Sequence, residues 1–169
     1  MPSPSDIVIV KDANIIIDLI NGDLLAAWVK LGITTYTTDM VESELKRGAQ
    51  WEKVEILIAS GSIVIESLTP DEIAHVLEMK RTHNVSVPDG SVLHLANTKN
   101  ARLLTGDRKL RLAAKNSQIQ VSGLLWILDL LVSTATISPK RASASLGKII
   151  SKGARLPQTE IEKRLHKWR

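Results

Sequence analysis

The chain has 169 residues, 44% of them hydrophobic and 24% charged, which is the size and composition of one globular domain. It has no cysteine, so disulfide bonds, thiolate zinc sites and a cysteine nucleophile are excluded. The net charge of +4 is uneven: residues 1–137 carry 13 basic and 16 acidic side chains, whereas residues 138–169 carry 9 and 2. This basic segment favours a nucleic-acid partner, although it also fits helix faces that are merely solvated.

The N-terminal stretch MPSPSD lacks the basic residues and the apolar block of a signal peptide. The longest apolar run, residues 124–132, is too short for a bilayer and contains Asp129. We therefore expect a cytoplasmic protein that does not associate with a membrane.

The first strand is predicted over residues 7–10, an unbroken β-branched run typical of a buried central strand, which leaves Asp12 at its carboxyl end. Asn14 is expected to cap a helix through residue 19. The other strands are expected over residues 33–37, 63–65, 102–104 and 119–121. The other helices of the core are expected over residues 23–31, 39–47, 51–59, 70–81, 88–99, 107–115 and 124–132.

Strands that alternate with helices in this way predict an α/β fold, a single Rossmann-like domain with a mostly parallel central sheet flanked by helices. In such sheets functional sites form at the carboxyl ends of the strands. We expect residues 1–135 to make up this core. Residues 136–169 are expected to form two basic amphipathic helices that pack on the core or on a partner chain.

Four acidic residues occupy positions that this fold would bring together. Asp12 and Asp107 follow predicted strands, and Asp89 lies in the first turn of a helix, on its apolar side. Helix periodicity separates Glu44, which is expected on the buried face of its helix, from Glu42, which is expected on the other side. Each acid also has an ordinary structural explanation, such as a turn or a helix cap.

Carboxylates that lie close together raise one another's pKa unless a divalent cation neutralises them. Oxygen ligands without His or Cys favour Mg²⁺ or Mn²⁺ over zinc. The four histidines lack metal-binding spacing and are expected at surface or ordinary helix positions, with His94 on the outward face of its helix: His75, His83, His94 and His166. The acids therefore predict a magnesium or manganese site.

Four sequence segments contain one of these acids each: VIVKDANIIIDL, VESELKRG, VPDGSVLHLAN and LLTGDRKLRLAAK. In this order and spacing, and over nearly its whole length, the chain resembles the PIN-domain nucleases, a family that includes the toxin ribonucleases of VapBC-type toxin–antitoxin pairs. The stretch VSGLLWILDLL and the closing helix after Pro157 are similar to the family's C-terminal part. One departure is Gly90, where a better helix former is usual and which could loosen the first turn behind Asp89.

The resemblance implies an endoribonuclease that hydrolyses RNA phosphodiester bonds to a 5′-phosphate and a 3′-hydroxyl with Mg²⁺ or Mn²⁺. It assigns metal binding to the four acids, Asp12, Glu44, Asp89 and Asp107. It implies two supporting groups beside the metal ligands, Asn14 and Thr105. Basic residues next to the fourth acid are candidate phosphate contacts: Arg108, Lys109 and Arg111. It further implies a homodimer and a small antitoxin protein as partners.

Two other classes of function are alternatives to a nuclease. One is a PIN-like fold that is catalytically weak or inactive and serves as a nucleic-acid-binding scaffold, against which the complete set of acids argues. The other is a phosphatase whose first strand ends in Asp-x-Asp, which is disfavoured because the second position is Asn14. A dinucleotide enzyme and a P-loop protein are disfavoured because neither glycine-rich motif is present.

Overall fold

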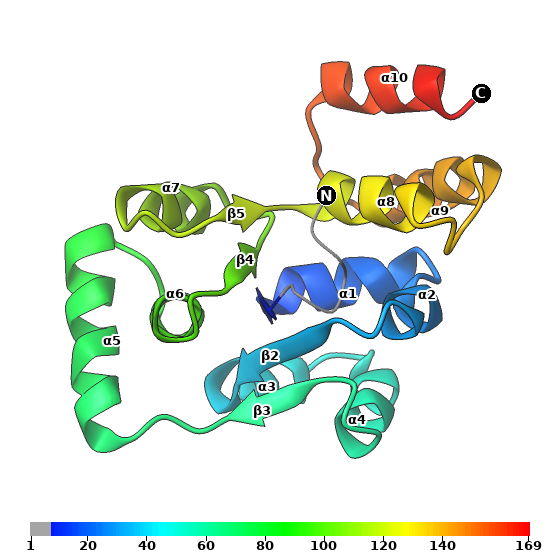
Figure 1. The fold of residues 1–169 in the computed structure, drawn as a ribbon. Helices are drawn as coiled ribbons and strands as arrows, with labels where there is room; N and C mark the ends of the chain where they lie inside the picture. The colour runs from blue at the N-terminus through cyan, green and yellow to red at the C-terminus, as the bar shows by residue number, and fades with distance from the viewer. Residues whose placement is uncertain (1–7) are drawn as a thin grey trace.

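A sheet of five short strands lies at the centre of the protein (Figure 1). The computed structural model describes the backbone of residues 8–169 and the side chains from Asp12 onward, so residue 7 of the predicted first strand lies outside the described residues. The strands are β1 (Val8–Lys11), β2 (Thr34–Thr38), β3 (Val64–Glu66), β4 (Arg102–Leu104) and β5 (Val121–Ser122). They pair in the order β3-β2-β1-β4-β5, and every pair is parallel.

Helices connect and cover these strands. Their bounds are α1 (Ala13–Asn21), α2 (Leu25–Lys30), α3 (Asp39–Leu45), α4 (Trp51–Ala59), α5 (Pro70–His83), α6 (Val87–Thr98), α7 (Arg108–Asn116), α8 (Leu124–Ser133), α9 (Pro139–Ser151) and α10 (Gln158–Lys167). The α/β class and the parallel sheet are thus as predicted. No helix in the described part of the chain is long and apolar enough to cross a membrane.

Strands β2, β3 and β5 begin one or two residues later than predicted, whereas β4 has the predicted bounds. Ile33, Ile63 and Ile119 were expected to open β2, β3 and β5, but each precedes the strand. All three side chains are buried in the core. The apolar pattern therefore predicted the burial of these residues correctly, but the hydrogen bonds between strands begin only after them.

The predicted cap of α1 was wrong. Asp12, rather than Asn14, caps the helix, because its Oδ1 accepts the Ile15 N–H at 3.0 Å. Asn14 lies within the first turn and is exposed. The helix begins directly after the strand and leaves no loop residue to act as a separate cap.

The core lies on both faces of the sheet. Leu103 and Leu104 are neighbours in β4 but belong to different hydrophobic clusters, because successive strand side chains point to opposite faces. The cluster of Leu103 packs against α6 and α7, and that of Leu104 packs against α8 and α9. Figure 1 shows α10 beyond α8 and α9, and α5 at the other end of the molecule, outside α6.

The two C-terminal helices share the core of the domain. Ile149 of α9 packs so closely on the end of α1 that a Cβ at Gly22 would lie 2.6 Å from its Cδ1. Ile161 of α10 and Trp168, which directly follows this helix, are buried in the same cluster. Arg164 links α10 to α8 through its Nε, 2.9 Å from Oδ2 of Asp129. The predicted amphipathic pair therefore buries its apolar residues within this chain.

Candidate active site

Because all five strands are parallel, their carboxyl ends meet at one edge of the sheet, and Asp12 lies there. It follows β1 and is only 3% exposed. Its Oδ1 caps α1, and its Oδ2 accepts a hydrogen bond from the hydroxyl of Thr105, which follows the neighbouring strand β4. A carboxylate in this position is fixed by two hydrogen bonds and faces little water.

The turn after β4 carries the second aspartate of this edge. Asp107 caps α7, with its Oδ1 accepting the Leu110 N–H at 2.8 Å. Its own N–H donates to the Thr105 hydroxyl at 3.0 Å. Thr105 is completely buried and bonded to both aspartates, so one side chain aligns the ends of two adjacent strands.

Asp89 comes to the same edge on the first turn of α6. Ser86 caps this helix and accepts the Asp89 N–H at 3.2 Å. Gly90 does not loosen the turn, because its N–H bonds to the Ser86 carbonyl at 2.9 Å. A Cβ at Gly90 would lie 3.2 Å from the carbonyl oxygen of Val76, so the glycine allows α5 to pack closely on α6.

Electrostatics link the three aspartates. Burial raises the pKa of Asp12 to about 6, its two hydrogen bonds oppose this rise, and the negative charges of Asp89 and Asp107 add to it. Burial also raises the pKa of Asp89, with a further contribution from the charge of Asp107. Three carboxylates from separate segments therefore repel one another at this edge and would be relieved by a cation.

The second predicted acid lies differently from the other three. Glu44 is exposed, and the expectation that it occupies the buried face of α3 was wrong. Glu42, expected on the opposite side, is half-buried and pairs with Lys46 at 3.2 Å. The helix is only seven residues long and its buried stripe consists of Val41 and Leu45, so Glu44 falls just outside it.

Sequence reasoning missed polar groups at the end of β2. The hydroxyls of Thr38 and Ser91 are both buried and lie 2.7 Å apart, which ties the start of α3 to α6. Asp39 directly follows the strand, and its Oδ1 is buried without a hydrogen-bond partner among the described residues. The signal that selected Asp12, an acid immediately after a strand, also applies to Asp39.

The donor set fits a hard divalent cation, because the carboxylates of Asp12, Asp89 and Asp107 supply oxygen ligands only. The negative charges of the buried Asp12 and the half-buried Asp89 repel each other, which gives such a cation an electrostatic reason to bind. Within the described residues, no three His, Asp or Glu side chains are already drawn together tightly enough to hold an ion. The aspartates are thus near neighbours rather than a closed ligand shell.

The three basic residues predicted as phosphate contacts divide into two kinds. Arg108 and Lys109 are exposed and form no ion pair with the residues that the structure describes. Arg111 is half-buried, and its Nη1 donates to the Thr105 carbonyl oxygen at 3.1 Å. A Cβ at Gly123 would lie 3.2 Å from this Nη1, so the glycine leaves room for the guanidinium behind the aspartates.

One histidine was misplaced by the sequence reasoning. His94, expected on an outward face, is buried, with its Nε2 3.4 Å from Oε1 of Glu72. Its ring stacks on His75 at a centroid distance of 5.9 Å. The reason is that α5 packs on the outer face of α6. If α6 alone covered the sheet here, that face would be exposed to solvent.

The protein is an α/β domain whose parallel sheet brings aspartates from three chain segments together at its carboxyl edge. It therefore belongs to the class of domains that have an acidic site at the ends of their strands. Residues 8–169 match the family model described as PIN domain (DUF3368), and the chain belongs to this PIN-domain family. The predicted resemblance is therefore confirmed. No curated protein matches the chain.

Among solved structures, the chain is similar to the crystal structure of PAE2754 from Pyrobaculum aerophilum. The TM-score is 0.56 and the sequence identity 16%, over 75% of this chain and 98% of that chain. At this identity the likeness concerns the fold alone.

Proposed function

We propose that the protein is a metal-dependent endoribonuclease that hydrolyses RNA phosphodiester bonds. The observation that carries the proposal is the meeting of Asp12, Asp89 and Asp107 at one sheet edge, close enough for their charges to raise the pKa of Asp12. PIN domains are typically metal-dependent nucleases, and this chain belongs to that family. Three clustered aspartates without a basic partner need a cation when they are ionised.

Asp12, Asp89 and Asp107 would hold Mg²⁺ or Mn²⁺, with Glu44 as a fourth ligand that reaches the ion from the exposed side of α3. A bound divalent ion lowers the pKa of its water and stabilises charge on the scissile phosphate. Thr105 would hold Asp12 and Asp107 in position through its hydrogen bonds to both residues. Arg108 and Lys109 would attract the phosphate backbone on either side of the bond that is cleaved.

The biological role that we propose is that of the toxin in a toxin–antitoxin pair. In that role a small antitoxin protein would bind the chain, and two copies of the chain would form a homodimer through apolar helix faces. The oligomeric state can be measured by light scattering, and a monomer would contradict the dimer.

The test of the activity is cleavage of single-stranded RNA with Mn²⁺, with Mn²⁺ and a chelator, and with the Asp12→Asn variant. Cleavage should require the ion and disappear in the variant, while the circular dichroism spectrum stays unchanged. The alternative, a scaffold that binds nucleic acid without cutting it, predicts RNA binding with no cleavage under any of these conditions. Cleavage retained in both Asp12→Asn and Asp89→Asn would overturn the assignment of the acids.

A further inference from the structure

A second polar feature lies at the opposite edge of the sheet from the aspartates. It is a hollow of about 240 Å³ at the amino ends of β4 and β5. Its rim and floor are formed by the end of α6, the segment that joins α6 to β4 and the segment that joins α7 to β5: Ala96, Asn97, Asn100, Ala101, Gln118, Ile119 and Gln120. The volume is below that of a drug-sized or dinucleotide pocket and suits one small planar group.

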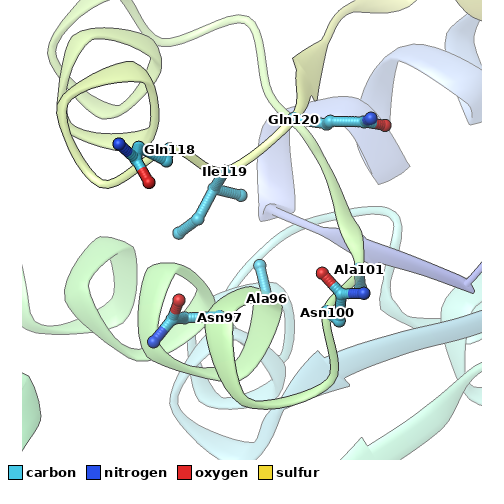
Figure 2. A pocket seen from close by; sticks show the side chains of 7 residues that line it. All are labelled: Ala96, Asn97, Asn100, Ala101, Gln118, Ile119 and Gln120. Carbon is cyan, nitrogen blue, oxygen red and sulfur yellow. The ribbon is translucent and has the colours of Figure 1, made fainter.

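The chemistry of the hollow is neutral and hydrogen-bonding. Figure 2 shows the side chains of Ile119 and Ala96 directed toward each other, with the carboxamides of Asn97 and Gln118 to one side and Asn100 to the other. No lining residue is charged, so neither a phosphate nor a metal ion finds a counter-charge there. A carboxamide offers both a donor and an acceptor and is the side chain that matches the edge of a nucleobase.

Two of these carboxamides sit where the backbone favours glycine. Asn100 and Gln118 have positive φ angles of 48° and 58°. They end their helices in the same way, followed by the bonds Ala101 N–H to Ala96 oxygen and Ile119 N–H to Ala114 oxygen. Glycine is the usual residue at this position, and glutamine has no particular tolerance of it. A side-chain function at the rim would account for glutamine in this position, whereas asparagine tolerates a positive φ more readily.

Helix α7 connects this hollow to the aspartates. It begins beside Asp107 and ends just before Gln118, a span of roughly 14 Å for nine residues. It contains four basic residues and no acid, and its exposed cations include Lys115 at the hollow end. In contrast, Lys148 of the basic C-terminal segment is already paired with Asp23 at 2.6 Å. The exposed cations of α7, Arg108, Lys109 and Lys115, form no ion pair with the residues that the structure describes, so positive charge extends along the whole distance.

We propose that the carboxamide hollow binds one unpaired base of the single-stranded RNA whose backbone follows α7 to the acidic edge. The proposal rests on the proposed function for the identity of the strand, and it assigns base selectivity to the carboxamides of Asn97 and Gln118, which lie on the same side of the hollow. Gln120 takes a different part, since its Oε1 accepts a bond from Arg102 at 2.9 Å.

The test measures binding in the presence of a chelator, so that no cleavage occurs and the result does not depend on catalysis. Fluorescence anisotropy gives the Kd of short single-stranded homopolymers of adenylate, uridylate and cytidylate. The protein should distinguish the tightest from the weakest by roughly tenfold or more. In Asn97→Ala combined with Gln118→Gly, the three affinities should become equal at the weakest wild-type level.

Gln118→Gly suits this purpose because glycine adopts the local φ more readily than glutamine, so the fold is retained while the carboxamide is removed. Ala135→Gly is the matched control: it relieves another positive φ, 53°, between α8 and α9 and should leave all three affinities unchanged. Equal wild-type affinities, absence of binding, or a preference that survives in the double variant would overturn the proposal. A free mononucleotide that binds as tightly as the homopolymer would overturn the path along α7.

The nuclease proposal is judged separately, by cleavage with Mn²⁺. Cleavage with an unchanged base preference in the double variant would leave the ribonuclease standing and remove the hollow from its substrate site. Base-selective binding without any cleavage would support the hollow and contradict the nuclease.

Discussion

The hydroxyl of Thr105 donates a hydrogen bond to Oδ2 of Asp12, although the two residues are 93 positions apart in the chain. Their strands, β1 and β4, are direct neighbours, with Lys11 opposite Leu104. Because the same hydroxyl accepts the Asp107 N–H, this one side chain sets the relation between two carboxylates. Removal of the hydroxyl should therefore affect both the stability of this edge and its affinity for a cation.

Thr105→Val keeps the branched shape of the side chain and removes only its hydrogen bonds. We expect the pKa of Asp12 to rise further and the free energy of unfolding to fall by about 1–3 kcal/mol, since buried partners are left unsatisfied. Loss of a group that orients a metal ligand typically weakens binding by about 10- to 100-fold. Calorimetric titration with Mn²⁺ measures this change. Thr105→Ser should restore most of the affinity, and a valine variant with wild-type affinity would contradict the role.

The pKa of Asp12 predicts how the metal-free protein responds to pH. Burial and neighbouring charges raise this pKa from its ordinary 3.8 to about 6, so the folded state holds the proton more tightly than the unfolded state. Stability from this group is therefore greatest below about pH 4, is lost between about pH 4 and 6, and stays constant above. Asp12→Asn cannot ionise and still caps α1. In urea unfolding with chelator at pH 7 it should be more stable than the wild type by about 1–3 kcal/mol.

Asp18 provides the control for this measurement. Its pKa is also raised to about 6, by burial alone, so Asp18→Asn should stabilise the protein over the same pH range. It should nevertheless leave the rise in melting temperature caused by Mn²⁺ intact, whereas Asp12→Asn should abolish that rise. Equal stability of Asp12→Asn and wild type at pH 7 would mean that the buried charge of Asp12 does not destabilise the metal-free protein.

Arg111 and Arg108 occupy the same helix but should have separable roles. Arg111→Met removes the bond to the Thr105 carbonyl, and we expect a loss of about 1–2 kcal/mol in unfolding free energy together with weaker Mn²⁺ binding. Arg108→Met should leave both unchanged, because the side chain is exposed and forms no ion pair within the described part of the chain. It should instead weaken RNA binding and lower the slope of log K against log salt by about 0.7–1. The reverse pattern would show that Arg111 contacts phosphate.

The order of strands and helices could be predicted from the sequence because periodicity and turn residues are local signals. Asp12 and Asp107 could be found for the same reason: Asp12 directly follows β1, Asp107 lies in the short turn after β4, and parallel strands share a carboxyl edge. The contact of Thr105 with Asp12 is not a local property. It depends on β4 pairing with β1, two strands far apart in the chain, and no local sequence pattern could derive this pairing.

The failures have equally specific causes. His94 was placed in solvent because one helix wheel cannot show that a second helix, α5, covers the outer side of α6. The hollow at the amino edge could not be predicted from the sequence, because carboxamides at helix ends are common. Asn100 and Gln118 come together only because the turns after α6 and α7 are neighbours in the fold. Glu44 failed because a helix of seven residues has too few turns to define its faces.

Glu44 and Glu42 allow the remaining acid to be assigned by experiment. Glu44 is exposed, so its substitution costs little packing, whereas Glu42 is half-buried and pairs with Lys46. If Glu44 completes the ligand set, Glu44→Gln should keep the wild-type melting temperature and reduce Mn²⁺-dependent cleavage by at least about tenfold. Glu42→Gln should lose only the weak pair with Lys46, about 0.3–0.5 kcal/mol, and retain activity. If only Glu42→Gln impaired cleavage, the fourth ligand would be Glu42. Helix α3 would then have to rotate so that the Glu42 side chain faces the aspartates.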